Sequence, residues 1–401
     1  MSPTSAINIV GEGLVYSGVR RVESLDEGLK QLARLLAHKS KDATFNALSQ
    51  GIDADWSLHE DIVNPLGDRR QALITVYTID LDHDRLLFSD EERNLEIPLY
   101  AFRKDESGLL EKLTPFEPPS PPIGNTNAFP APYWRPSRGA SARSVPFVKR
   151  VITDFGIVWR HILRREYSDH TLRHFAKAIL CMGSLDLEIQ EEASRHLHTS
   201  MLPQRGPYVW IHSRPSWEPC SAPMFKLGRI TVVLNQNLEQ SMSLAKIDKG
   251  RMKGSEGNDV STYLLLSIRH IALCNINSAG EVKYTEPAAL LNGTDSPSHA
   301  AVLTLLQAAS FALLPQPRSP IHKLPLEIQD RILGYISDGG IIAAQLGCLL
   351  ELGLPFKWLR TDDTRRSGPI QVLLSPTHRH ENTPVESKLH IKGTFCGLSY
   401  R

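Results

Sequence analysis

A cluster of prolines interrupts this 401-residue chain between residues 115 and 146. Nine of these 32 residues are proline, placed among serine, glycine and asparagine. Proline fixes φ and has no backbone donor, so the stretch cannot sustain a helix or a sheet. We predict a linker or an irregular surface strap between an N-terminal region (1–114), a middle region (147–296) and a C-terminal region (297–401). A polyproline II ligand for another protein is the alternative.

Apolar residues at helical spacing predict helices on both sides of this segment. The predicted helices cover 25–36, 42–50, 147–163, 171–181 and 298–314, with another near Glu191. Runs of β-branched and aromatic residues predict strands. These cover 72–79, 85–88, 208–212, 228–234, 370–374 and 388–392, and a single long strand over 261–276 at the centre of a sheet. The first two are expected to form a hairpin.

A charged, glycine-containing stretch, 246–259, predicts an exposed loop between two of these strands. The mixture of periods predicts an α+β fold. We expect antiparallel-rich sheets with flanking helices, and a helical segment near the C-terminus.

The charge balance argues against several classes of partner. Lys plus Arg (45) nearly equals Asp plus Glu (44), and a net charge of +1 creates no field that would gather nucleic acid or anionic lipid. The chain has no run of about 18 apolar residues and no secretory signal pattern at its start. Five scattered cysteines without a CxxC pair indicate reduced thiols, which predicts a cytoplasmic or nuclear protein.

One acidic run is similar to a catalytic motif. Residues 80–84, Asp-Leu-Asp-His-Asp, follow a predicted strand, and they resemble the DxD of haloacid-dehalogenase-type phosphatases. The resemblance implies a metal-dependent phosphatase-like hydrolase centred on Asp80 and Asp82. The same run with Glu91 imitates a calcium loop, but Arg85 occupies its glycine position. A hairpin turn rich in Asp is the simpler interpretation.

Other catalytic or metal-binding patterns are absent from the sequence. It contains no GxSxG, no Walker loop and no GxGxxG. The histidine pairs, such as His196 and His198, lack a third ligand nearby. We therefore expect no metal and no cofactor. The sequence favours a protein without enzymatic activity. A Cys–His nucleophile pair that forms only in space stays open.

The most motif-like run lies between residues 324 and 336, with the sequence LPLEIQDRILGYI. Pro325 suits the first turn of a helix, and Glu327 suits the positive end of its dipole. Apolar residues then form a stripe along the helix. The stripe consists of Leu324, Ile328, Ile332, Leu333 and Ile336. A second apolar helix, 341–352, is expected to be buried and to end at Gly353.

This run resembles the start of an F-box, whose pattern is Leu-Pro-x-Glu-(Ile/Leu) followed by Ile-Leu and a closing aliphatic residue. Cys348 and Trp358 are similar to its later helix. In that family the helices pack on the Skp1 adaptor and join a substrate receptor to a cullin ubiquitin ligase. The resemblance implies a non-enzymatic interaction protein with two partners, a Skp1-like adaptor and a client protein. The implied partner-binding residues are Leu324, Pro325, Glu327, Ile328, Ile332, Leu333 and Ile336.

The runs 76–82 and 263–270, taken together with the F-box-like segment, resemble uncharacterised filamentous-fungal protein families. That wider resemblance implies an accessory or regulatory protein of a secondary-metabolite pathway, with no separable activity. One further alternative is purely architectural: residues 324–336 would be a capped amphipathic helix that closes the core of the C-terminal region. The exposure of the apolar stripe distinguishes a helix that binds a partner from a helix that closes the core, because a docking helix presents an open apolar face.

Overall fold

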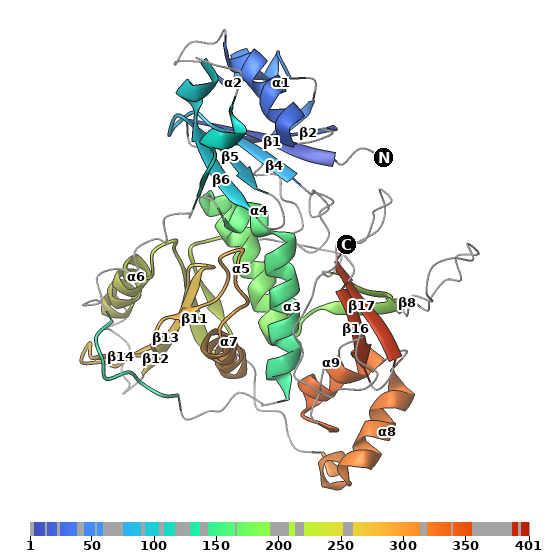
Figure 1. The fold of residues 1–401 in the computed structure, drawn as a ribbon. Helices are drawn as coiled ribbons and strands as arrows, with labels where there is room; N and C mark the ends of the chain where they lie inside the picture. The colour runs from blue at the N-terminus through green and yellow to red at the C-terminus, as the bar shows by residue number, and fades with distance from the viewer. Residues whose placement is uncertain are drawn as a thin grey trace, which may run out of the picture. The chain divides into compact units, whose positions relative to one another are not determined.

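The computed structural model describes residues 4–12, 14–21, 25–37, 44–52, 54–58, 75–89, 93–103, 108–116, 129–136, 143–164, 167–192, 208–212, 220–251, 260–312, 319–337, 340–354, 387–391 and 394–400 (Figure 1). The chain divides into two units. The first comprises 1–63, 70–120 and 160–171, and the second comprises 64–69, 121–159 and 172–401.

The first unit contains a seven-stranded sheet with the order β3-β2-β1-β4-β5-β6-β7. Its strands are β1 (Thr4–Gly11), β2 (Leu14–Arg21), β3 (Asp55–Leu58), β4 (Thr75–Asp80), β5 (Arg85–Ser89), β6 (Asn94–Pro98) and β7 (Thr114–Pro115). β1 and β4 run parallel, and every other neighbouring pair in this sheet is antiparallel. The predicted hairpin of β4 and β5 is confirmed.

Helix α1 (Leu25–Ala37) supplies the leucines that cover this sheet. Leu29, Leu32 and Leu36 are buried in one cluster with Ile7, Ile9, Tyr77 and Ile79. Because these leucines recur every three or four residues, they share one face of the helix. Further helical elements among the described residues of this unit are α2 (Phe45–Ser49), η2 (Leu99–Arg103), η3 (Leu110–Lys112) and α4 (Arg160–Leu163).

The second unit contains a sheet with the order β10-β11-β12-β13-β14, and β15 also pairs with β13. The strands are β10 (Met224–Leu227), β11 (Ile230–Leu234), β12 (Ser261–Leu266), β13 (His270–Ile276), β14 (Val282–Tyr284) and β15 (Ala288–Ala289). β11 and β12 are parallel, and α6 (Leu238–Arg251) connects them as a crossover helix. A smaller sheet has the order β16-β17-β9-β8. It consists of β8 (Glu188–Glu192), β9 (Tyr208–His212), β16 (Ser387–Ile391) and β17 (Thr394–Tyr400).

Helices cover both faces of the larger sheet in the second unit (Figure 1). Val233, Tyr263 and Leu265 face α6, where they cluster with Met242 and Ala245. Alternate strand residues point to the opposite face. There α7 (His299–Ala312) contacts β11 and β13. The described part of this unit also contains α3 (Ser144–Val158), α5 (Asp169–Ser184), η4 (Pro320–Lys323), α8 (Leu326–Ile336) and α9 (Gly340–Leu350). The predicted mixed α+β fold with antiparallel-rich sheets is confirmed.

Residues 129–136 of the proline-rich segment form an irregular strap along β14. The Trp134 backbone N–H donates to the Tyr284 carbonyl at 2.7 Å, and the Tyr284 hydroxyl donates to the Pro130 carbonyl at 2.9 Å. Phe129 is buried in the cluster under α6. α3 begins at Ser144, inside the predicted strap, because the first helical turn accepts Pro146.

The long strand predicted over 261–276 is wrong. Residues 261–266 and 270–276 form an antiparallel hairpin, β12 and β13, although β12 does lie centrally in its sheet. The turn is closed by a hydrogen bond from the Ser267 N–H to the His270 carbonyl (3.0 Å), and Ile268 adopts φ +69°. A β-branched residue rarely occupies this left-handed region, so the sequence carries no conventional turn signal here.

Several other predictions need correction. The helix expected near Glu191 is strand β8, and residues 246–251 of the expected loop belong to α6. The helix expected over 147–163 is interrupted at Trp159. Within the second unit, α3 contacts both α7 and α9. The strand predicted over 370–374 lies outside the described residues.

We predict that Gly183→Ala destabilises the second unit. A Cβ at Gly183 of α5 would lie 2.5 Å from Leu305 Cγ of α7, so the two helices would have to move apart. Overpacking of this kind costs about 1–3 kcal/mol. Urea denaturation should show this loss. Gly250→Ala in α6, where a Cβ meets nothing within 4 Å, is the control and should not destabilise. A Gly183→Ala variant as stable as the natural chain would contradict this packing.

Candidate functional site

The F-box-like run, residues 324–336, directly follows the 3-10 turn η4 and forms helix α8. The N–H groups of Ile328 and Gln329 both donate to the Pro325 carbonyl, at 3.0 and 3.1 Å, so the helix begins directly after Pro325. Glu327 lies in the first turn, where the helix dipole favours a negative charge. The helix predicted here is confirmed.

The inner face of α8 is narrow. Only Gln329 and Leu333 of the helix are buried, each 3% exposed. They are four residues apart and therefore neighbours on one side of the helix. Leu333 lies against two glycines: a Cβ on Gly347 or Gly353 would come within 3.1 or 2.9 Å of Leu333 Cδ1. The glycines thus let α8 approach the end of α9 closely.

Gln329 fastens this inner face with polar contacts. Its Nε2 donates to the Leu324 carbonyl at 2.8 Å and lies 3.4 Å from the His322 carbonyl. Its Oε1 accepts the N–H of Gly353 at 2.8 Å. The side-chain amide therefore joins three segments: the end of η4, α8, and the turn after α9. We call this set of contacts the Gln329 clasp.

Three further contacts reinforce the Gln329 clasp. His322 Nε2 lies 3.0 Å from the Leu350 carbonyl, and the Ser319 N–H donates to His322 Nδ1 at 3.1 Å. The Leu354 N–H donates to Asp330 Oδ1 at 3.2 Å. The first two contacts are part-buried and the third is exposed, and together they hold η4 and α8 to the end of α9 and the turn after it.

Helix α9 connects this assembly to the rest of the second unit. Gln345 Nε2 donates to the carbonyls of Leu185 and Leu187, at 3.1 and 2.8 Å. The Ser144 hydroxyl at the start of α3 lies 3.5 Å from the Cys348 carbonyl. The expectation of a fully buried helix is only partly right: Gln345, Gly347 and Cys348 are buried, but most other described side chains of α9 are half-buried, and Leu349 is exposed.

The outer face of α8 is apolar and open. Ile328 is 40% exposed, Ile336 61% and Tyr335 88%, and Ile332 between them is half-buried. Thirteen large apolar side chains are exposed in the described part of the chain, and seven of them lie between residues 324 and 354. These seven are Leu324, Leu326, Ile328, Tyr335, Ile336, Leu349 and Leu354. Exposed apolar side chains gathered in this way mark an interaction surface.

The residues implied by the F-box resemblance are divided between the two faces. Leu324, Pro325, Glu327, Ile328 and Ile336 are exposed and Ile332 is half-buried, whereas Leu333 points into the contact with α9. Sequence reasoning missed Tyr335, which stands seven residues after Ile328 and therefore on the same side of the helix. It also missed Leu326 and the buried Gln329, a polar residue within an apolar pattern.

The acidic run 80–84 lies in the turn between β4 and β5. Asp80 is buried, and its carboxylate is already occupied. It accepts the His83 N–H at 3.1 Å, lies 2.9 Å from His83 Nδ1 and accepts Arg85 Nε at 3.2 Å. Asp82 is exposed and accepts the Glu12 N–H at 2.8 Å. These contacts close a hairpin turn and do not favour the phosphatase-like alternative.

The described residues contain no group of three or more His, Cys, Asp and Glu side chains that could hold a metal ion. Three of the described thiols, those of Cys220, Cys274 and Cys348, have raised pKa values. Burial raises the pKa of Cys348 to about 11 and those of Cys220 and Cys274 to about 12. Catalytic cysteines have lowered pKa values instead, because the thiolate is the reactive form.

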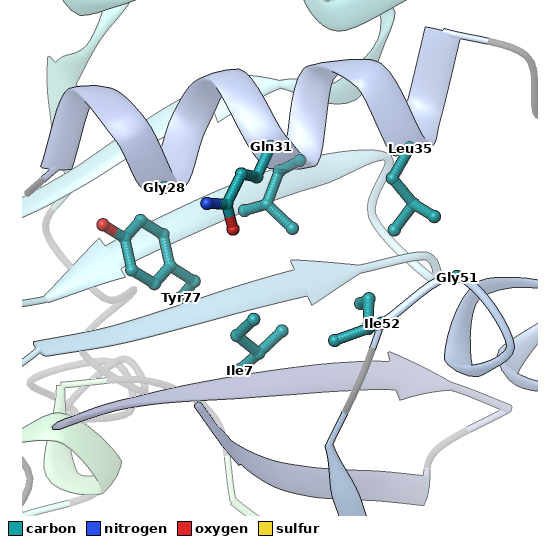
Figure 2. A pocket seen from close by; sticks show the side chains of 8 residues that line it. Ile7, Gly28, Gln31, Leu35, Gly51, Ile52 and Tyr77 are labelled. Carbon is teal, nitrogen blue, oxygen red and sulfur yellow. The ribbon is translucent and has the colours of Figure 1, made fainter. Parts of the chain in front are cut away.

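A small hollow lies between α1 and the sheet of the first unit. Figure 2 shows Gln31 and Leu35 reaching from the helix towards Ile7, Ile52 and Tyr77. The space open to the centre of a water molecule is about 20 Å³, which is room for about one water. It is too small for a metabolite, so it does not identify an active site.

Comparison with protein-family models, curated proteins and solved structures finds no match to this chain. Among the helices of the described residues, none is both long and apolar enough to cross a lipid bilayer.

We predict that Gln329→Leu loosens α8 from α9. The substitution leaves the Gly353 N–H and the Leu324 carbonyl without their partner, which costs roughly 2 kcal/mol. Amide hydrogen exchange in α8 should then be roughly thirtyfold faster, as local opening follows local stability. Gln31→Leu in α1 is the control and should leave exchange in α8 unchanged. Unaltered exchange in Gln329→Leu would mean that the clasp does not hold the helix.

Proposed function

We propose that this chain is a non-enzymatic protein–protein interaction protein that works as an F-box-type adaptor for a ubiquitin ligase. Its docking face would consist of the exposed side chains of Leu324, Leu326, Ile328, Tyr335 and Ile336. The observation that carries the proposal is that these side chains are open to solvent while Gln329 and Leu333 of α8 are fixed against α9 and the turn after it.

An apolar face of this kind gains free energy when a partner covers it, at roughly 25 cal/mol for each Å² removed from water. Amphipathic helices commonly bind by laying such a face into a hydrophobic groove. The Gln329 clasp reduces the ordering that binding would require, because η4 and α8 are already held in place. Both features favour a docking role for α8 and argue against a helix that only closes a core.

The nature of the partner rests on the sequence pattern. Residues 324–336 resemble an F-box, so the proposed partner is a Skp1-like adaptor protein. The mixed α/β parts of the chain that precede α8 would then bind the client. Cys181, Cys220, Cys274 and Cys348 are free thiols, which supports a reducing compartment, the cytoplasm or the nucleus.

Co-elution with a purified Skp1-like adaptor tests this proposal. The natural chain should co-elute, and Ile336→Asp should weaken binding roughly a hundredfold or more. The reason is that a carboxylate buried at an apolar interface without a partner costs several kcal/mol. Ile336 is 61% exposed, so the substitution should leave the fold and the circular dichroism spectrum intact.

The matched control is Ile247→Asp on α6. Ile247 is 52% exposed and lies in a different helix, so its substitution should not affect co-elution. A natural chain that fails to bind the adaptor would refute the adaptor function. Equal loss of binding in both Asp variants would show a general effect of charge and remove the evidence for this docking face.

A further inference from the structure

Two thiols of the second unit lie on neighbouring segments, α5 and the stretch that leads into β10. Cys181 is half-buried near the end of α5, and Cys220 is 7% exposed shortly before β10 begins. Neither of them is in a disulfide. The function proposed above uses neither thiol.

A hydrogen bond attaches the stretch before β10 to α5. Arg173 Nη1 donates to the Ser221 carbonyl at 3.5 Å. Arg173, Lys177 and Cys181 follow one another at intervals of four residues, so they lie along one side of the helix. The side of α5 that holds Ser221 is therefore also the side that carries Cys181.

The electrostatic surroundings of Cys220 agree with this placement. Burial raises the pKa of Cys220 to about 12; Lys177 lowers this pKa, and a Cys181 thiolate raises it. Both side chains act on Cys220 more strongly than Arg173, which contacts the adjacent Ser221. Because the interaction between charges weakens with distance, the thiols of Cys181 and Cys220 lie close together.

We propose that Cys181 and Cys220 form a reversible disulfide when the protein reacts with hydrogen peroxide. The two residues come from segments that the Arg173–Ser221 hydrogen bond already holds together, so the bond needs only a local movement of side chains. In a reducing compartment a disulfide of this kind is transient and responds to oxidants.

The half-buried thiol of Cys181 reacts first. Its sulfur attacks the peroxide, the O–O bond breaks, and the sulfur becomes a sulfenic acid while the released hydroxide takes up a proton to form water. The Cys220 sulfur then attacks the Cys181 sulfur, and the hydroxyl group leaves with the Cys220 proton as a second water. The positive charge of Lys177 favours the Cys220 thiolate that this step needs. Two thiols and one peroxide thus give one disulfide and two waters.

The disulfide acts on the part of the second unit that supports α9. It closes the chain between α5 and β10 into a loop, which contains β8 and β9. Closing such a loop reduces the conformational entropy of the unfolded chain and so stabilises the folded one. Gln345 of α9 donates to the carbonyls of Leu185 and Leu187, which lie within this loop. Oxidation therefore strengthens the structure to which α9 is attached.

Peptide mapping under non-reducing conditions tests the pair. The full chain is reduced, freed of reductant, treated with a small excess of hydrogen peroxide, alkylated and digested. A peptide that links Cys181 to Cys220 should be the main disulfide product and should disappear after treatment with dithiothreitol. Cys274→Ser is the control: Cys274 is fully buried in the cluster under α6, so its replacement should not change the yield of this peptide.

Thermal unfolding tests the effect on stability. Peroxide should raise the melting temperature of the natural chain by several degrees, and dithiothreitol should reverse the rise. The same treatment should not raise the melting temperature of Cys181→Ser. This comparison uses each chain before and after oxidation, so it does not depend on equal stability of the variants.

Three results of the peptide mapping would overturn the proposal. They are the absence of the linked peptide, a link from Cys181 to a different cysteine, and oxidation of Cys181 to the sulfinic acid alone. A linked peptide without a rise in melting temperature would overturn the stabilising role of the bond. An equal rise in Cys181→Ser would do the same, because the stabilisation would then have another source.

Discussion

The side-chain amide of Gln329 joins three segments of the chain at a point where water is excluded. It binds the carbonyl of Leu324 and the N–H of Gly353, and thereby holds η4 and α8 to the turn after α9. Because each of these buried groups would be costly without a partner, α8 cannot rotate about its axis. The orientation of every other side chain on the helix follows from this constraint.

With Gln329 and Leu333 turned inwards, Ile328 and Tyr335 face outwards, and Ile336 is exposed at the last residue of the helix. A helix that served only to close a core would turn its widest apolar face inwards. Here the inner face is the narrower one, and two glycines accommodate its single large apolar side chain. The wider apolar face is exposed to solvent and can contact a partner. This exposure is the physical basis of the proposed docking function.

Much of the fold was predictable from local pattern. The leucines of α1 and the β-branched run of β4 have clear periods of 3.6 and 2, so both elements were expected from the sequence. The β12–β13 hairpin was not, because its turn places Ile268 at positive φ instead of using glycine or asparagine. Strand β8 was missed because its acidic sequence, EIQEE, lacks strand propensity and pairs only through the fold.

The candidate site was predictable in outline. The stripe through Ile328, Ile332 and Ile336 located the helix and its apolar side, and spacing alone could have added Tyr335. No pattern could assign Leu333 to the inner face, because it borders the same stripe and its burial depends on Gly347 and Gly353, distant in sequence. The acidic run at Asp80 is similar to a catalytic motif by composition, and in the structure its polar contacts close the hairpin of β4 and β5.

The central claim is that α8 is fixed on one side and open on the other before any partner binds. Hydroxyl-radical footprinting of the free chain, read by mass spectrometry, tests it most directly. Tyr335 and Ile336 should be oxidised at rates close to those of the unfolded chain, and Leu333 should be strongly protected. Protection of Tyr335 in the free chain, or oxidation of Leu333 as fast as that of Ile336, would contradict the account.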